Sequence, residues 1–363
     1  MSGAVLDDPV ALARFDRSGM LEAIAGLPAQ VADGWSRTRE LTLPGVHRAA
    51  HAVAVLGMGG SAIGGDLVRG VLADRLRVPL VVVRDYELPA FVDGSTLVVA
   101  SSFSGATEET VAALAIALER RCPAVIVTTG GPLLEVARRA ELPHLAFPGG
   151  GQPRASLGYS MILLAGLLER AGFLRLDELE VAAAVRAGED AVDACVPAVP
   201  TERNPAKQLA WSLMDRLPVI EAAGFLAPVA RRWKTQLNEN GKSTAVWEEL
   251  PEATHNAVVG YAQPRVLLDD LYVVFLASED DHERNALRRS ASAGLLDAAH
   301  IDHQVVTAGG QGRLAQAVNA IVLGDFTSAY LGLLYGLDPT PVEAIAMLKE
   351  RLAKAAPSES GAA

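Results

Sequence analysis

Short apolar runs, each of strand length, constrain the fold of this chain most strongly. The first run occupies residues 51–56, and four more follow at 80–83, 97–100, 124–127 and 144–147. Segments of helical length lie between most of these runs. Strands that alternate with helices form parallel sheets whose two faces are covered by the helices. The sequence therefore predicts an α/β fold built on a doubly wound parallel sheet.

A second α/β series begins near Leu217. Its predicted strands are 218–221, 271–276 and 304–306. The hydrophobic spacing predicts helices in both halves of the chain and between them; these cover residues 8–40, much of 156–215, and 226–238, 281–297, 311–334 and 341–355.

These patterns predict two similar α/β domains with additional helices. The predicted parts are an N-terminal helical extension (1–45), a first domain (46–195), a second domain (206–335) and a C-terminal helix with a frayed tail (336–363). The proline-rich segment 194–205 is the predicted linker. No clear sequence repeat relates the two halves.

The composition and the net charge of the chain argue against a nucleic-acid partner. The chain has 363 residues, with 32 Lys and Arg against 43 Asp and Glu, so its net charge is −11. It has no basic stripe interleaved with aromatic residues, which argues against a nucleic-acid partner. A small anionic ligand stays possible, because backbone amides can bind it whatever the net charge.

The chain is expected to be cytoplasmic and not to enter a membrane. A spanning helix needs roughly 20 consecutive apolar residues, and the best candidate run, 161–168, is far shorter. The N-terminus lacks the basic and apolar regions of a signal peptide. Cys122 and Cys195 lie far apart in apolar surroundings, so both are expected to be reduced core residues. No Cys/His spacing predicts a metal site.

The first glycine-rich loop follows a buried strand in the sequence VAVLGMGGSAIGGDL at 53–67. Glycines let the backbone turn sharply, and the start of the next helix presents free N–H groups that attract an anion. The pattern fits a dinucleotide loop, with Asp85 near the position of a ribose-binding acid. It fits equally a loop for a phosphate monoester, with Ser61 as a donor, or a tight turn without a ligand.

The second loop favours the phosphate monoester. Residues 97–110 read LVVASSFSGATEET, an apolar strand that leads through four hydroxyl residues and a glycine into a helix. One helix N-cap needs a single hydroxyl, whereas the three oxygens of a terminal phosphate need several converging donors. This loop resembles the hydroxyl-rich phosphate loop of sugar isomerase (SIS) domains. Such domains form flavodoxin-like parallel sheets and often occur in pairs.

A wider resemblance covers most of the chain. It is similar to the bifunctional phosphoglucose/phosphomannose isomerases of archaea and bacteria. The similar segments are GMGGSAIGGD at 57–66, SSFSGATEET at 101–110, PRASLGY at 153–159, NEN at 238–240, HN at 255–256, LGDFTSAYL at 323–331 and DPTPVEAIAMLK at 338–349.

The resemblance implies an aldose–ketose isomerase that works without cofactor or metal. It would convert glucose 6-phosphate or mannose 6-phosphate to fructose 6-phosphate through a cis-enediol(ate). Glu239 would be the general base, His255 would open the sugar ring with help from Lys349, and Arg154 would stabilise the negative charge on the enediolate. The implied phosphate-binding residues are Gly59, Gly60, Ser61, Ser102, Ser104 and Thr107.

The resemblance also implies a homodimer in which His255 comes from the neighbouring subunit. Thr340 is a candidate for the small hydroxyl residue that lets one pocket accept both sugars. One position departs from the family, which commonly reads HNE where this chain has Ala257. A sugar-phosphate-binding protein with little turnover therefore stays an alternative, and a nicotinamide-dependent oxidoreductase is a more distant one.

Overall fold

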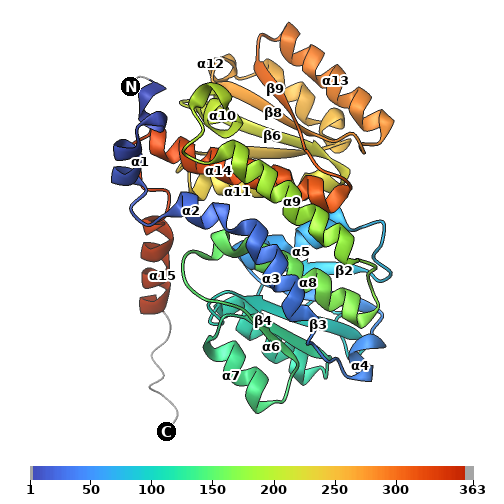
Figure 1. The fold of residues 1–363 in the computed structure, drawn as a ribbon. Coiled ribbons are helices and arrows are strands. Elements are labelled where there is room, and N and C mark those ends of the chain that lie inside the picture. The colour runs from blue at the N-terminus through green and yellow to red at the C-terminus, as the bar shows by residue number, and fades with distance from the viewer. Residues whose placement is uncertain (1–2, 356–363) are drawn as a thin grey trace.

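The computed structural model describes residues 3–355 and contains two parallel sheets, one from each half of the chain (Figure 1). The tail after Pro357, which the sequence predicts to be frayed, lies outside the described residues. The first sheet has five strands, namely β1 (Ala52–Leu56), β2 (Leu80–Val83), β3 (Thr96–Ser102), β4 (Ala124–Thr128) and β5 (His144–Ala146). Their order is β2-β1-β3-β4-β5, which is the flavodoxin-like order expected from the sequence.

The second sheet repeats this topology with four strands. They are β6 (Leu217–Ala223), β7 (Val246–Leu250), β8 (Leu271–Ala277) and β9 (Asp302–Thr307), in the order β7-β6-β8-β9. The sequence analysis missed β7. This strand lies at an edge of the sheet and reads VWEEL, so it lacks the apolar run that a buried parallel strand carries.

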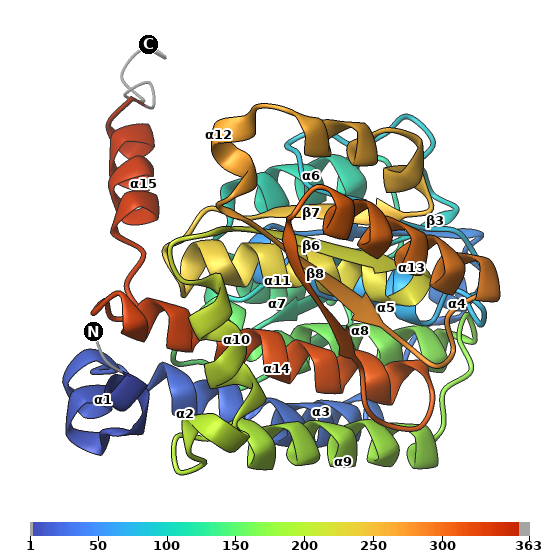
Figure 2. The same ribbon diagram turned by 90° about the horizontal axis from the view of Figure 1, so that it is seen from above.

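Helices lie between the two sheets and on their outer faces (Figures 1 and 2). Between the sheets are α3 (Leu27–Thr38), α5 (Gly59–Val71), α8 (Leu157–Ala171), α9 (Glu178–Cys195), α11 (Ala227–Glu239) and α14 (Arg313–Leu334). The outer helices are α6 (Glu108–Glu119) and α7 (Gly131–Arg139) on the first sheet and α13 (Glu283–Ala298) on the second. The shorter helices are α1 (Pro9–Phe15), α2 (Met20–Ala25), α4 (Gly45–Arg48), α10 (Pro205–Leu213) and α12 (Arg265–Leu268).

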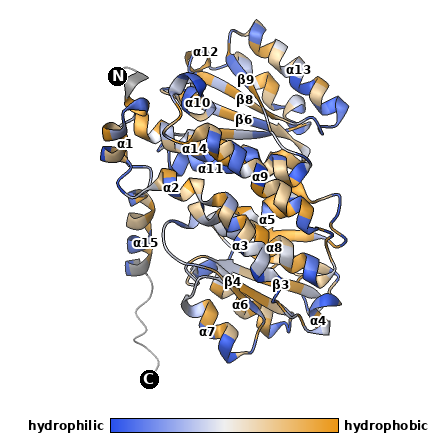
Figure 3. Cartoon of the chain, viewed as in Figure 1, coloured by the Kyte–Doolittle hydropathy of each residue, from blue (hydrophilic) through white to orange (hydrophobic). Residues whose placement is uncertain are grey.

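Alternation along the strands divides the apolar residues between an inner and an outer core. In β1, Val53 and Val55 join the large core between the sheets, whereas Ala54 and Leu56 join the core under α6 and α7. Figure 3 shows β3 and α5 largely in hydrophobic colours. Burial on both faces explains why these strands read as continuous apolar runs.

Helix α14 is the central helix of the inner core. It is long and apolar enough to cross a membrane by length and composition, yet 89% of its apolar window is buried inside the protein. It packs against α9, α10 and α11. Its apolar composition is therefore explained by the core of the protein, as expected for a helix covered on all sides.

The predicted linker is packed against the body of the protein. Asn204 donates hydrogen bonds to the carbonyls of Cys195 and Val196, and the Lys207 ammonium donates to those of Pro197 and Val199. Both Asn204 and Lys207 are fully buried. The segment is therefore internally hydrogen-bonded, although its prolines prevent a regular helix.

The C-terminal helix α15 (Glu343–Ala355) lies apart from both sheets in two perpendicular views (Figures 1 and 2). Its apolar residues Ile345, Leu348 and Leu352 recur at helical spacing and are 42–57% exposed. The helix was predicted at 341–355, and the structure confirms it. An amphipathic helix normally buries such a stripe against another surface.

Candidate active site

The glycine loop and the start of α5 form one wall of the candidate site. Gly57 lets β1 approach β3, since a Cβ at this position would lie 2.9 Å from the carbonyl oxygen of Ser101. Gly60 lets the start of α5 approach the segment before α8, because its Cβ would lie 3.0 Å from the carbonyl oxygen of Pro153. Among the described residues, no side chain caps the N-terminus of α5. The N–H groups of Gly59 and Gly60 at this helix start can bind an anion, whereas the N–H of Ser61 donates to the carbonyl of Met58. The phosphate-binding roles of Gly59, Gly60 and Ser61 stay predictions.

The hydroxyl loop lies beside the glycine loop, because β1 and β3 are adjacent and end at the same edge. The Ser102 and Thr107 hydroxyls are 2.7 Å apart, and Ser102 also accepts a hydrogen bond from the N–H of Gly105. Ser104 is exposed and accepts from the N–H of Ala106 at 3.2 Å. Gly105 has φ +65°, and a Cβ there would lie 1.8 Å from the carbonyl oxygen of Gly130. The loop therefore has a fixed shape with its hydroxyls gathered together.

Arg154 and Glu239 lie in contact where the two halves meet. Glu239 is the last residue of α11, is 30% exposed, and its carboxylate lies 3.5 Å from Nη1 of Arg154. Arg154 is 3% exposed and donates four hydrogen bonds, to Asn240, Gln152 and the carbonyls of Pro339 and Thr340. Burial lowers the pKa of Arg154, and the Glu239 carboxylate opposes that shift. The arginine thus fixes the surroundings of the carboxylate.

A buried ion pair supports the positions of Arg154 and Glu239. Arg232 and Asp325 make two hydrogen bonds of 3.2 and 2.7 Å, and both side chains are almost fully buried. Arg232 also donates to the carbonyl of Arg154 at 2.7 Å, and Asn240 donates to the Ser328 hydroxyl. Residues of α11 and α14 therefore hold Arg154 in place from the second half of the chain.

A cluster of charged residues that the sequence analysis did not assign lies beside Glu239. Arg84 and Arg231 both bind the buried carboxylate of Asp66, which lies on α5. Together with Gly59, Gly60 and Glu239 they line a cavity of about 220 Å³ between α5 and α11. One signal could have found Arg84: it directly follows β2, next to the glycine loop, and ligands of open α/β sheets bind at the carboxyl ends of strands.

A second cavity, of about 550 Å³, adjoins Glu239 on the side of α15. Leu337, Pro341, Val342 and Ile345 give it a mainly apolar wall. Lys242 lines it too and donates hydrogen bonds to the carbonyls of Glu239 and Pro339. Burial and the nearby Arg154 lower the pKa of Lys242 to about 8. The carbonyl of Thr340 accepts a hydrogen bond from Arg154, so the backbone of this residue lies next to the Arg154–Glu239 contact, and the role of its hydroxyl stays a prediction.

The structure does not bring His255 or Lys349 to Glu239. His255 is exposed in a 3-10 helix (Glu252–His255) that contacts β7, and Lys349 is exposed on α15. Neither residue lines a cavity that contains Glu239. Within the described chain, Gly59, Gly60 and Glu239 line one cavity and Arg154 contacts Glu239, whereas His255 and Lys349 lie elsewhere. The two loops that adjoin this cavity carry the remaining predicted residues, which do not line it, namely Ser61, Ser102, Ser104 and Thr107.

Ala257, where the family commonly has glutamate, packs against a small apolar cluster of Ala223, Leu250 and Ala253. A carboxylate is nevertheless present nearby, because Glu252 accepts a hydrogen bond of 2.6 Å from the Asn256 side chain. The His255–Asn256 pair therefore has an acidic neighbour from a different position in the sequence.

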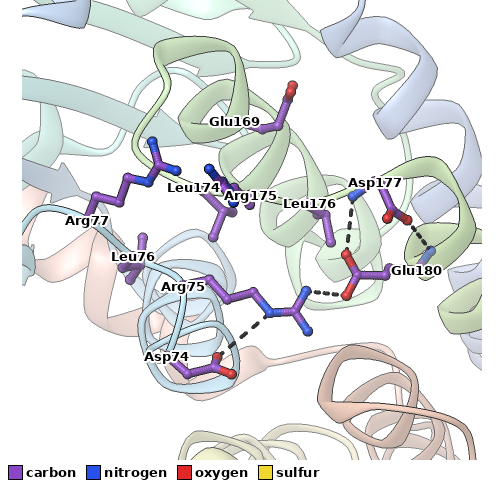
Figure 4. A pocket seen from close by; sticks show the side chains of 10 residues that line it. All are labelled: Asp74, Arg75, Leu76, Arg77, Glu169, Leu174, Arg175, Leu176, Asp177 and Glu180. Carbon is purple, nitrogen blue, oxygen red and sulfur yellow. Dashed lines mark hydrogen bonds and ion pairs between the residues drawn. The ribbon is translucent and has the colours of Figure 1, made fainter.

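A larger cavity, about 820 Å³, contains none of the predicted site residues (Figure 4). Its lining residues come from the segment after α5, the end of α8, the connection between α8 and α9, and the start of α9. In Figure 4, Arg75 pairs with Asp74 and Glu180, and Glu180 closes the N-terminal cap of α9, whereas no dashed line reaches Arg77 or Arg175. Glu239 and the residues gathered around it do not line this cavity, so its size does not identify it as the site.

Glu221 is a buried carboxylate outside the site. It lies in the middle of β6, is 1% exposed, and among the described residues its two oxygens have no hydrogen-bond partner. Its neighbour on β7 is Glu248. Burial, with a smaller effect of Glu248, raises the pKa of Glu221 to about 7. The folded protein therefore keeps this proton at pH values where the unfolded chain has released it.

We expect Glu221 to make the protein less stable as pH rises from about 4.5 to 7, with no further loss above that window. A difference of about 2.5 pKa units corresponds to roughly 3 kcal/mol. Glu221→Gln should raise the denaturation midpoint in urea at pH 8 and flatten its pH dependence between pH 5 and 7. The exposed Glu135→Gln serves as a control, and equal pH profiles in both variants would contradict the assignment.

Similarity to known proteins extends over most of the chain. Residues 202–352 match the family described as the bacterial phospho-glucose isomerase C-terminal SIS domain. A bifunctional phosphoglucose/phosphomannose isomerase of Caldicellulosiruptor bescii is 38% identical over 92% of this chain and 99% of its own length. A protein of the same name from Aquifex aeolicus is 34% identical over 83% of this chain and 90% of its own.

Solved structures show the same fold at lower identity. A glucose-6-phosphate isomerase like protein from Thermus thermophilus has a TM-score of 0.62 at 22% identity, covering 93% of this chain and 98% of its own. A hypothetical protein from the same organism has a TM-score of 0.75 at 19% identity, covering 96% of this chain and 93% of its own. The order of the strands and the neighbouring glycine and hydroxyl loops agree with the sequence relatives. These relatives establish that the chain belongs to the bifunctional phosphoglucose/phosphomannose isomerase family of SIS-domain aldose–ketose isomerases.

Proposed function

We propose that this protein interconverts glucose 6-phosphate and mannose 6-phosphate with fructose 6-phosphate. The observation that carries the proposal is the contact between Arg154 and Glu239 in a site that also contains the free N-terminus of α5. A carboxylate held beside an anion site can move a proton on a substrate whose phosphate is fixed. The relatives with this name support the choice of the two sugars.

In the proposed reaction the start of α5 and the hydroxyl loop hold the phosphate. Glu239 takes the proton from C2 of the open-chain aldose and returns it to C1 of the cis-enediol(ate) intermediate. Arg154 orients Glu239, and its charge favours the enediolate. His255 opens the ring, with Lys349 assisting, and Thr340 borders the place where C2 turns between the two sugars.

The proposed enzyme is a homodimer that completes its site with His255 of the neighbouring subunit. Two exposed apolar surfaces support this. One is the stripe of α15 that contains Ile345, Leu348 and Leu352, and the other includes Val259 and Val266 in the segment that follows His255. Each of these side chains is at least 42% exposed. Exposed apolar surfaces of this kind commonly mark contacts between subunits.

The assay that tests the function offers purified protein glucose 6-phosphate and mannose 6-phosphate separately, with a chelator present, and measures fructose 6-phosphate. Formation from both sugars is expected. One relative, from Sulfolobus acidocaldarius, is named D-glucosamine-6-phosphate 4-epimerase and is 33% identical over 61% of this chain. Glucosamine 6-phosphate is therefore a third substrate to offer, and turnover of it alone would contradict the proposal.

The second candidate is a sugar-phosphate-binding protein with little turnover, and Ala257 is the observation that favours it. It predicts binding of fructose 6-phosphate without isomerisation.

We further propose that the protein works in the cytoplasm, and the two cysteines support this, because Cys122 and Cys195 are both free and buried.

A further inference from the structure

The carboxylate of Asp66 faces more positive charge than it can neutralise. Asp66 is 3% exposed, and its Oδ2 accepts hydrogen bonds from Nη2 of Arg84 and from Nη1 of Arg231, the latter at 3.0 Å. Arg69 lies farther away, at 3.8 Å from Oδ1. One carboxylate and two bound guanidinium groups leave about one uncompensated positive charge at this point.

The two guanidinium groups face the cavity that contains Glu239. Arg84 follows β2 in the first half and Arg231 lies on α11 in the second, so they approach from opposite sides. Their side chains are 26% and 36% exposed. Among the described residues, the hydrogen bonds of each go only to Asp66. A guanidinium group has five N–H donors, so each arginine keeps several that a ligand can use.

The other cations around this cavity are already engaged. Arg232 is bound to Asp325 and to the carbonyl of Arg154. Arg154 has four hydrogen bonds to protein groups besides its contact with Glu239. It can favour negative charge through its field, but it has few N–H groups left to donate to a substrate. Donors for the substrate must therefore come from elsewhere.

We propose that Arg84 and Arg231 are catalytic residues that donate hydrogen bonds to the oxygens on C1 and C2 of the bound phosphosugar. The proposal rests on the isomerase function proposed above. When Glu239 removes the C2 proton, the electrons of the C–H bond form the C1=C2 double bond and the carbonyl electrons move onto O1. The negative charge on O1 then lies beside two donors fixed in advance by Asp66. The O2 proton passes to O1, and as the C2=O bond forms the electrons of the C1=C2 bond take the proton back from Glu239 at C1.

The location favours the enediolate over the phosphate as the bound group. The phosphate already has the hydroxyls of Ser102, Ser104 and Thr107 and the start of α5 as donors. Arg84 and Arg231 instead share their cavity with the general base. A group that stabilises charge produced by proton transfer has to lie near the base that takes the proton.

The test compares Arg84→Gln and Arg231→Gln with Arg69→Gln, a control arginine that is 55% exposed and does not line the cavity. We expect kcat to fall about 100-fold or more in the two cavity variants and to stay unchanged in the control. Two probes separate the roles. Binding of an alditol 6-phosphate, which carries no charge at C1, should persist, whereas an aldonate phosphate, whose carboxylate resembles the enediolate, should bind far more weakly.

Several outcomes would overturn the proposal. Unchanged kcat would contradict it, and equal loss of affinity for both probes would indicate a phosphate contact instead. If a glutamine variant does not fold, Arg231→Lys keeps the charge and the contact with Asp66, and an unchanged kcat and unchanged aldonate phosphate affinity in this variant would then contradict the proposal. Absence of turnover in the wild-type protein would contradict the isomerase function itself, whereas full turnover in all arginine variants would contradict only the roles of Arg84 and Arg231.

Discussion

Glu239→Gln is expected to lower kcat for both sugar phosphates by at least about 1,000-fold, near the upper range for loss of a general base. The amide has nearly the shape of the carboxylate but cannot accept the C2 proton at neutral pH. The phosphate-binding loops are untouched, so fructose 6-phosphate should still bind. The measurement is the initial rate of fructose 6-phosphate formation, together with binding of fructose 6-phosphate by calorimetry.

A matched control is available in Glu119→Gln, because Glu119 is also the last residue of a helix but is exposed on α6. This variant should retain the wild-type rate. Comparable rates in the Glu239 and Glu119 variants would mean that another group is the base. Loss of both rate and binding in the Glu239 variant would mean that the carboxylate mainly maintains the shape of the site, with Arg154 left buried without its acidic neighbour.

The second large effect is expected when two inactive variants are combined in one dimer. Glu239→Gln and His255→Ala homodimers should each be almost inactive. A heterodimer of the two has one site with both mutations and one site with neither, provided that His255 acts across the interface. We therefore expect the isolated heterodimer to recover about half of the wild-type activity.

The experiment co-expresses the two variants with different affinity tags and isolates the heterodimer by two successive purifications. Activity per dimer is then compared with that of doubly tagged wild-type protein. An inactive heterodimer of normal size would mean that His255 serves its own subunit. A protein that remains monomeric by light scattering would contradict the dimer as a whole.

Much of the fold could be predicted because burial on both faces leaves a clear trace in the sequence. Strands β1, β3 and β4 are fully apolar in their centres, and each was predicted to within a few residues. Strand β7 could not be predicted, because an edge strand needs no apolar face and its glutamates give no periodic signal. The division into four parts with boundaries at 45, 195 and 335 stays a prediction. Helix α9, for example, packs mainly against α14 of the other half.

The candidate site was predictable to the extent that its residues lie in short sequence motifs. Gly60, Arg154 and Glu239 were proposed from three separate motifs, and the structure brings them together. Arg84 and Arg231 were not proposed, because isolated arginines are usually solvated and only the folded chain brings both to Asp66. His255 and Lys349 were proposed together with Glu239, but in the structure both are exposed and neither lines a cavity that contains it. Their positions relative to Glu239 therefore could not be predicted from the motifs.

The hydrogen bonds from Arg154 to Pro339 and Thr340 also bear on the order in which the protein assembles during synthesis. Arg154 and the glycine loop are made early, whereas its carbonyl acceptors leave the ribosome only after the strands of both sheets have been translated. Until then the guanidinium group has lost water without gaining all its partners, which is costly. The first half can form its sheet beforehand, but its catalytic wall becomes stable only when residues 339–340 arrive. Nascent chains that stop before this point should therefore lack a competent site even though most of the core is present.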